Sequence, residues 1–150
     1  MKSPKNAEIL RPNPWRIIFI FIAIFLAFEL IFVLSFISSL DEKFYIFSGL
    51  LLAATIVFCV ITIRSTVYEI FHNKIIHKKL GKETEYYFSD ILFIDEEFTL
   101  KHKMLLFYDK DGKDKYLILD KNKKILEIMD ENVRQISEEE LLRRFPNVKL

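Results

Sequence analysis

Histidine is the residue type in this chain best suited to metal binding or to proton transfer near neutral pH. There are three histidines, His72, His77 and His102. The second and third fall in segments predicted to be strands, where they could face each other across a sheet. No cysteine or carboxylate stands at ligand spacing from them, and a structural zinc site needs four ligands. The sequence therefore predicts no metal site.

Segment 109–114 (DKDGKD) carries three carboxylates in six residues, which invites comparison with a calcium-binding loop. An EF-hand loop has its glycine at position 6 and a bidentate glutamate at position 12. Here Gly112 comes two positions too early, and the last position is Asp120. Asp-Gly favours the positive φ angles of a tight turn. We therefore predict a β-hairpin turn at this segment.

The sequence contains no motif of a common catalytic site. It has no glycine-rich phosphate loop, no His-Glu-x-x-His and no Gly-x-Ser-x-Gly. The single cysteine, Cys59, excludes an internal disulfide. A formal net charge of +1 argues against a general nucleic-acid binder. We predict a non-enzymatic protein without a cofactor, and an enzyme with an unrecognised site is the alternative.

Two long apolar runs dominate the first half of the chain. Residues 17–39 contain one charged residue, Glu29, and residues 44–63 contain none. Each run reaches the roughly 20 residues that cross a bilayer core. Only residues 40–43 separate them, which predicts an antiparallel transmembrane hairpin. A signal peptide is not favoured, because its apolar region is only ~7–15 residues long and a second span follows here at once.

The predicted organisation is a tail at residues 1–16, the hairpin at 17–63 and a soluble domain at 64–150. Cytoplasmic loops of membrane proteins carry an excess of Lys and Arg. Basic residues flank the hairpin on both sides, whereas Lys43 is the only one between the spans. We therefore expect a multi-pass protein of the cell membrane with both termini in the cytoplasm.

Glu29 is the most unusual residue, since a carboxylate near the middle of a span is costly. It could be a proton- or cation-linked site, or a polar contact with another subunit. It could equally be a neutral carboxyl group hydrogen-bonded to Ser48, Thr55 or a backbone carbonyl. No other charged residue occurs in either span, so a transport pathway is not favoured.

Small residues let transmembrane helices approach closely. Two small-xxx-small pairs, Ala23 with Ala27 and Gly49 with Ala53, are therefore candidates for helix packing.

A basic cluster follows the second span. It consists of Lys74, Lys78, Lys79 and Lys82. A lysine close to anionic headgroups contributes about 1 kcal/mol of binding free energy. The cluster is thus a candidate for contact with lipid headgroups, and ordinary solvated strand charge is an equal alternative.

After residue 65 the pattern predicts an α+β domain of antiparallel strands followed by helices. Runs rich in β-branched and aromatic residues predict strands. These runs are residues 66–71, 74–80, 83–88, 91–94, 100–108 and 115–119. Residues 125–133 have helical spacing. A last helix follows, with Ser137 and Glu140 as a capping box and Ile136 and Leu141 as a hydrophobic staple.

The last helix is expected to bury Leu141, Leu142 and Phe145 against the open side of the sheet. Pro146 then ends it.

The order of these segments resembles bacterial membrane-anchored pleckstrin-homology-like (PH-like) domain proteins. The residues that carry the resemblance are 66–70 (TVYEI), 74–78 (KIIHK) and 87–91 (YFSDI), preceded by two transmembrane helices. The resemblance implies a bent, partly open antiparallel β-barrel closed at one end by the C-terminal helix. It extends over residues 17–145.

These observations lead to one expected function and one alternative. The first is a non-catalytic PH-like module, anchored in the lipid bilayer, that mediates protein–protein or self-association at the cytoplasmic membrane face. Its partners would be a second copy or another membrane protein. The alternative is an accessory subunit of a membrane transporter or envelope enzyme that contacts partner helices through Glu29.

Overall fold

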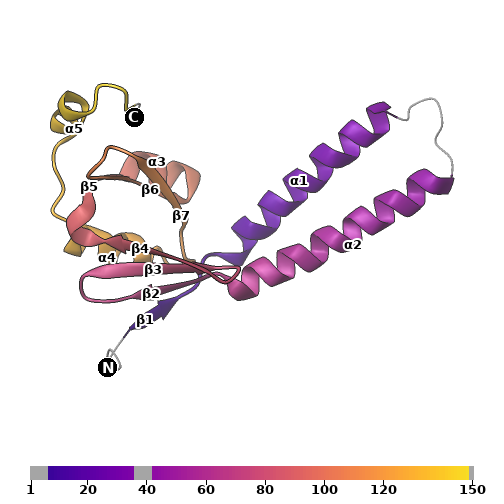
Figure 1. The fold of residues 1–150 in the computed structure, drawn as a ribbon, viewed down its shortest axis with the longest axis horizontal. Coiled ribbons are helices and arrows are strands. Elements are labelled where there is room, and N and C mark those ends of the chain that lie inside the picture. The colour runs from indigo at the N-terminus through magenta and orange to yellow at the C-terminus, as the bar shows by residue number, and fades with distance from the viewer. Residues whose placement is uncertain (1–6, 36–41, 149–150) are drawn as a thin grey trace. The chain divides into compact units, whose positions relative to one another are not determined.

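The computed structural model describes residues 7–35 and 42–148 (Figure 1). The chain divides into two compact units. Pro14–Ser65 forms one unit, here called the helical hairpin, and the described residues before and after it form the other, here called the β domain.

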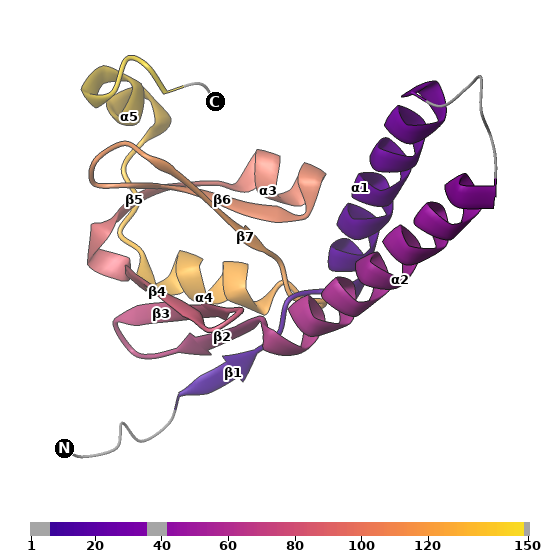
Figure 2. The same cartoon turned by 45° about the vertical axis from the view of Figure 1, so that its right-hand side comes forward.

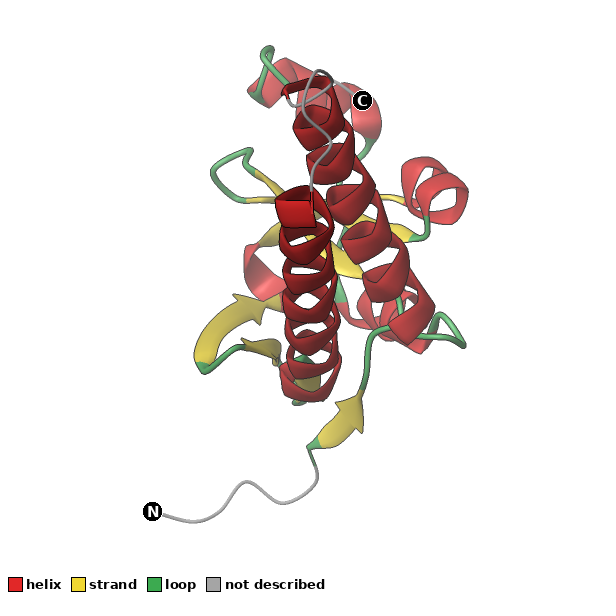
Figure 3. Ribbon diagram, turned by 90° about the vertical axis from the view of Figure 1, so that its right-hand side faces the viewer, coloured by secondary structure: helices red, strands yellow, loops and turns green. Residues whose placement is uncertain are grey.

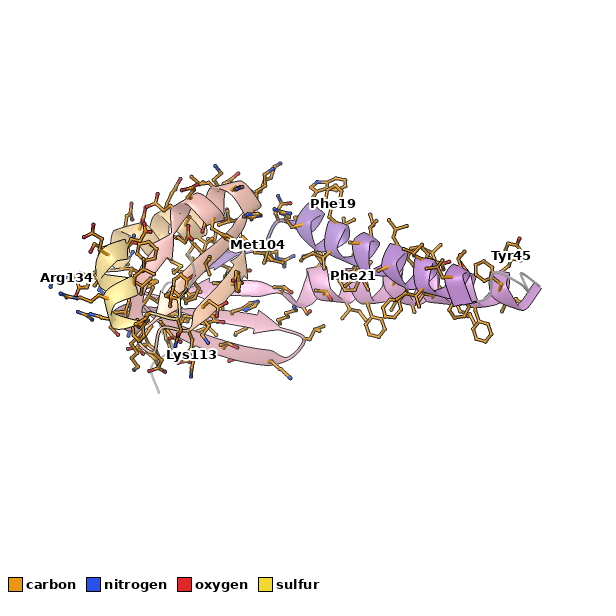
Figure 4. All side chains as sticks on the ribbon, turned by 90° about the horizontal axis from the view of Figure 1, so that it is seen from above. Phe19, Phe21, Tyr45, Met104, Lys113 and Arg134 are labelled. Atoms are coloured by element: carbon orange, nitrogen blue, oxygen red, sulfur yellow. The ribbon has the colours of Figure 1, made fainter. Side chains whose placement is uncertain are left out.

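The helical hairpin consists of α1 (Pro14–Ser35) and α2 (Glu42–Ser65), which lie side by side (Figure 3). Both are long and apolar enough to cross a membrane, with mean hydropathies of 3.1 and 2.6. Only 6% of the apolar window of α1 and 0% of that of α2 is buried. Side chains such as Phe19 and Tyr45 are exposed (Figure 4). The expectation of two such helices is confirmed. Residues 36–41 lie outside the described residues; they include the end of the first predicted span and half of the predicted loop.

The first sheet of the β domain has the order β1-β2-β3-β4 and is antiparallel throughout. The strands are β1 (Glu8–Leu10), β2 (Val67–Ile70), β3 (Lys74–Lys79) and β4 (Lys82–Tyr87). Strand β1 lies in the segment 1–16, which the sequence predicted to be a separate tail. Its three residues are too few to show the alternation of apolar and polar side chains that identifies a strand. It pairs with β2, with Glu8 opposite Ile70 and Leu10 opposite Tyr68. The helical hairpin is therefore inserted between two neighbouring strands.

The second sheet has the order β5-β6-β7 and follows a short 3-10 helix, η1 (Phe88–Asp90). Its strands are β5 (Ile91–Asp95), β6 (Met104–Asp109) and β7 (Asp114–Ile118). Leu105 and Phe107 of β6 belong to the main core, whereas Leu106 and Tyr108 pack on the opposite face. Because both faces are buried, β6 reads as a continuous apolar run instead of an alternation.

The predicted strand at residues 100–108 is wrong in its first part, where the chain forms α3 (Glu96–His102). Asp95 caps this helix, because its Oδ1 accepts a hydrogen bond from the Phe98 backbone N at 2.8 Å. Glu96 and Glu97 lie in the first turn, where negative charge stabilises a helix. Lys103 ends the helix in a left-handed conformation, with φ of 54°.

Helix α4 (Lys124–Asn132) supplies the core between the sheets (Figure 2). Its Ile125 and Met129 are completely buried. Asp120 fixes the start of the helix, since its two carboxylate oxygens accept hydrogen bonds from the backbone N of Asn122 and of Ile125, both at 3.0 Å. The helix predicted at 125–133 is thus present.

Helix α5 (Glu138–Arg144) packs on the outer face of the second sheet, beside Leu106 and Tyr108. The Ser137 hydroxyl accepts a hydrogen bond from the Glu140 backbone N at 3.2 Å, as the capping box predicts. Leu141 is buried, but Leu142 is exposed, so the predicted burial of Leu142 is wrong. Only one face of this short helix is buried, and Leu142 lies outside that face.

The described strands form two sheets and not a closed barrel. Among the described residues, one isolated β-bridge joins the segment after β1 to the segment after β7, and it pairs Pro12 with Asp120. The hydrogen bond from Asn13 N to Leu119 O at 2.9 Å lies next to it. Tyr68 makes a second connection. Its hydroxyl donates to Ile118 O at 3.0 Å and accepts from Ile118 N at 3.1 Å.

Replacement of Tyr68 tests how much this connection stabilises the β domain. The side chain is 1% exposed, and its burial raises the pKa of the hydroxyl. Tyr68→Phe leaves the N–H and C=O of Ile118 without their partner. We expect the free energy of unfolding to fall by about 1–3 kcal/mol, measured by urea titration of the full chain in detergent.

The control is Tyr87→Phe, which removes a hydroxyl that donates to the exposed carboxylate of Glu85. A surface change of this kind stays within about 0.5 kcal/mol. Equal effects of the two substitutions would contradict the role given to Tyr68.

Candidate functional site

A polar pair lies between the two apolar helices. The Ser48 hydroxyl of α2 donates a hydrogen bond to Oε1 of Glu29 in α1 at 2.7 Å, and both residues are half-buried. Ser48 is one of the partners expected for Glu29. Thr55, another, donates instead to the backbone oxygen of Leu51 at 2.8 Å. The carboxyl group thus contributes a hydrogen bond to the packing of the hairpin.

Aromatic side chains continue the contact between the helices. The ring centroid of Phe32 lies 6.0 Å from that of Phe44 and 6.2 Å from that of Phe47. Half-buried positions on α2 recur every three or four residues, which is the spacing of one helix face. They include Phe44, Ser48, Leu51, Thr55 and Cys59.

The four small residues proposed for helix packing lie elsewhere. Ala23, Ala27, Gly49 and Ala53 are exposed, and a Cβ added at Gly49 would meet no atom within 4 Å. The contact between α1 and α2 therefore runs through large and polar side chains, and the small ones face outward.

A groove of about 380 Å³ opens beside the polar pair. Apart from Glu29 and Ser48 its lining is apolar. The other lining residues are Phe28, Phe32, Phe47, Leu50, Leu51 and Ala54. Glu29 and Ser48 are its only lining residues with polar side chains, and they are hydrogen-bonded to each other.

In the β domain, the basic cluster divides into two pairs of lysines. Lys74 forms an ion pair with Glu85 at 2.8 Å, and Lys78 forms ion pairs with Glu69 at 2.6 Å and Glu83 at 3.4 Å. Hydrogen bonds with these carboxylates raise the pKa of both lysines. Their charge is compensated within the sheet.

Lys79 and Lys82 form no ion pair with any residue that the structure describes. Both are exposed, and they lie opposite each other at the tip of the β3–β4 hairpin. Uncompensated positive charge is therefore concentrated at the tip of the hairpin and not along its strands.

The histidines are not brought together into a site. His77 lies on β3, His102 at the end of α3, and His72 in the turn before β3. Within residues 7–35 and 42–148 there is no group of three or more potential metal ligands. The ring of His102 stacks on Phe98 at 4.3 Å, and that of His77 lies 5.1 Å from Tyr68.

The segment at Asp109 forms the predicted hairpin turn. Oδ1 of Asp109 accepts hydrogen bonds from the backbone N of Asp111 and of Lys113, each at 3.0 Å. Gly112 has φ of +72°, and a Cβ at this residue would lie 2.4 Å from the Phe145 ring. The Asp109 carboxylate therefore holds the turn.

No family model, no curated protein and no solved structure matches this chain. What the chain does must therefore be argued from its own residues.

His77 should make the stability of the β domain depend on pH. Its Nε2 is buried and finds no partner among the described residues, so protonation is unfavourable in the fold. Burial, together with the charge of Lys79, lowers the pKa of His77 below its usual 6.5. The unfolded chain then binds the proton more readily, so this contribution is present above pH 6.5 and declines as the pH falls towards the folded-state pKa.

The measurement is the free energy of unfolding across this pH range. His77→Gln should make the pH dependence shallower. Identical pH profiles for the original chain and the His77 variant would contradict this account.

Proposed function

We propose that the chain is a non-catalytic membrane-anchored module with a PH-like domain, which mediates protein–protein or self-association at the cytoplasmic membrane face. The observation that carries the proposal is the insertion of two uncovered apolar helices between the paired strands β1 and β2.

Exposure of the hairpin supports the anchor. A core helix of a soluble protein also has high hydropathy, but it is buried. Here the apolar windows are almost entirely exposed, and a soluble protein rarely leaves so large an apolar surface uncovered. The hydrocarbon core of a bilayer would remove this apolar surface from water. A helix can lie there because its backbone hydrogen bonds are made within the helix itself.

The pairing of β1 with β2 supports the arrangement of the domain. Leu10 and Tyr68 are strand partners, and they stand a few residues before α1 and after α2. Two crossings of a bilayer return the chain to the side from which it started, and this pairing requires such a return. The excess of Lys and Arg outside the spans favours the cytoplasmic side.

The strand order supports the PH-like identity. In the part of the chain that the structure describes, the first sheet has four antiparallel strands and the second has three, and residues of α4 pack between the two sheets. This agrees with the partly open barrel and helix that the resemblance implies. In this proposal the closing helix is α4, and α5 is an addition on the outer face.

The outward small residues support association within the membrane. Ala23 and Ala27 on α1, and Gly49 and Ala53 on α2, are exposed at spacings of four residues. Such positions allow the backbone of another helix to approach closely, which is a main source of helix association in lipid.

An accessory subunit of a larger membrane complex is the second candidate. The groove beside Glu29 favours it, since its apolar surface can receive side chains of a partner helix and Glu29 and Ser48 lie in its wall.

Removal of the hairpin tests the anchor. Because β1 and β2 are antiparallel neighbours, a short Gly-Ser linker from Asn13 to Thr66 can replace Pro14–Ser65. We expect the full chain to stay in membranes after an alkaline carbonate wash and the shortened chain to be soluble and folded. A full chain released by the wash would contradict the anchor, whatever the behaviour of the shortened chain.

Glu29→Leu distinguishes the two candidates. The full chain is extracted in mild detergent, and its molar mass and co-purified proteins are measured. Self-association through small residues predicts a homo-oligomer that Glu29→Leu leaves unchanged and that Ala27→Leu, a matched change of size on the outer face, disrupts. Loss of a co-purified partner on Glu29→Leu, with no effect of Ala27→Leu, would favour the accessory subunit instead.

A further inference from the structure

Strand register shows which turns of the β domain lie at the end where the chain passes into α1 and returns from α2. Val67, which follows α2 closely, is opposite Lys78, so the β3–β4 turn lies at this end of the first sheet. Pro12, which precedes α1, is bridged to Asp120. We call this the junction end of the β domain.

The second sheet places a further turn at the junction end. Met104, at the start of β6, pairs with Ile118, which is two residues from Asp120. Lys103 and the segment after β7 therefore also lie there. Figure 4 labels Met104 and Arg134, which follows α4, at opposite ends of the β domain.

The junction end is rich in lysine. Lys79, Lys82, Lys103, Lys121 and Lys123 are all exposed, and none forms an ion pair with a described residue. The nearby Asp120 is buried, accepts hydrogen bonds from the backbone N of Asn122 and Ile125, and forms no ion pair with any of these five lysines.

Two hairpin turns with nearly the same sequence allow a direct comparison. The β3–β4 turn at the junction end is Lys79-Leu80-Gly81-Lys82, and the β6–β7 turn is Lys110-Asp111-Gly112-Lys113. In the second turn both lysines are compensated, by Asp90 at 3.3 Å and by Asp111 at 3.9 Å. In the first turn an exposed leucine takes the place of the aspartate.

Leu80 is poorly suited to its position on structural grounds. Its φ is +50°, a left-handed conformation that is costly for a branched apolar residue and that Asn or Asp adopts more readily. Its side chain is 52% exposed. Lys79 and Lys82 are strand partners, and like charges placed opposite each other destabilise a hairpin. None of these three features, the backbone conformation of Leu80, its exposed side chain and the pairing of Lys79 with Lys82, stabilises the β domain.

We propose that the junction end is a docking surface for anionic lipid, in which the five lysines bind headgroups and Leu80 enters the interface between headgroups and acyl chains. An anionic surface relieves the repulsion between Lys79 and Lys82 and removes Leu80 from water. The lysine stems bury along the interface while the ammonium groups remain at the phosphates.

The inference rests on the membrane anchor proposed above, because the chain enters and leaves the two apolar helices at the junction end. It also limits the lipid-contact candidates. Lys74 and Lys78 are occupied by Glu85, Glu69 and Glu83, whereas Lys103, Lys121 and Lys123 join the surface.

The experiment uses the full chain in lipid nanodiscs, with one tryptophan as reporter. Trp15, the only natural one, is first replaced by phenylalanine. Leu80→Trp then reports on the junction end, and Asp111→Trp reports on the matched turn. In nanodiscs containing phosphatidylglycerol, brominated acyl chains should quench Leu80→Trp, and acrylamide should reach it several-fold less well than it reaches Asp111→Trp.

Charge variants separate docking from the preference of tryptophan for interfaces. Lys79→Gln with Lys82→Gln should reduce the equilibrium constant between the docked and undocked states about 25-fold, since each lysine contributes about fivefold near an anionic surface. Lys110→Gln with Lys113→Gln, the matched pair in the other turn, should change nothing. High salt should act like the first pair, because the Debye length falls to ~3 Å at 1 M.

The outcomes distinguish this inference from the anchor. A chain that does not elute with the nanodiscs overturns both. A chain that does elute, but in which both tryptophans are equally open to acrylamide, overturns the docking surface alone. Quenching that is the same in pure phosphatidylcholine and insensitive to the lysines would also overturn it.

Leu80→Asp gives an independent check of the structural reasoning. It gives the junction turn the same four-residue sequence as Lys110-Asp111-Gly112-Lys113. Because Asp adopts a positive φ more readily than Leu, the melting temperature of the chain should rise. The same change should abolish the protection of a reporter tryptophan at Thr84, an exposed position on β4. A lower melting temperature would show that Leu80 serves the fold, which would contradict the proposal.

Discussion

Three residue pairs between β1 and β2 constrain the rest of this structure. Glu8–Leu10 comes before the helical hairpin in the chain, Tyr68–Ile70 comes after it, and the two segments are hydrogen-bonded neighbours. A chain that passes through two long helices must therefore return to its starting point. The pairing also completes the first sheet, since it covers one edge of β2 and places Tyr68 against Ile118 of the second sheet. The hairpin and the β domain are thus linked by topology before any contact between them is considered.

The β domain and the hairpin handle polar groups in different ways. In the β domain, buried polar atoms serve the backbone, as Asp120 does for α4 and Tyr68 does for β7. In the hairpin, Ser48 satisfies Glu29 on the neighbouring helix, next to a groove lined by apolar side chains. A hydrogen bond between helices holds them in one register, which apolar packing in lipid specifies only weakly. The hydrogen bond between Glu29 and Ser48 therefore contributes to the packing of the hairpin itself.

Much of this architecture could be predicted from the sequence, because the signals were local. Uninterrupted apolar runs, the Asp-Gly turn and the capping box at Ser137 each specify an element without reference to distant residues. Strand β1 could not be predicted, since three residues become a strand only through the partner across the hairpin. Helix α3 was missed although Asp95 and the two following glutamates are a usable helix start. The apolar residues of β6 made residues 100–103 look like part of the same strand, whereas residues 100–102 belong to α3.

The candidate site was predictable in kind but not in detail, for a physical reason. The sequence identifies lysines that follow a long apolar helix, but only the strand register shows which of them have carboxylates nearby on the neighbouring strands. Lys78 lies between Glu69 and Glu83 across two strand pairs, so its charge is compensated within the sheet. Lys79 is one residue further and has Lys82 as its strand partner. A shift of one residue therefore separates a charge that holds strands together from one that is available to a partner. Positive charge at the junction end follows from this pairing pattern and not from composition, which is nearly neutral for the whole chain.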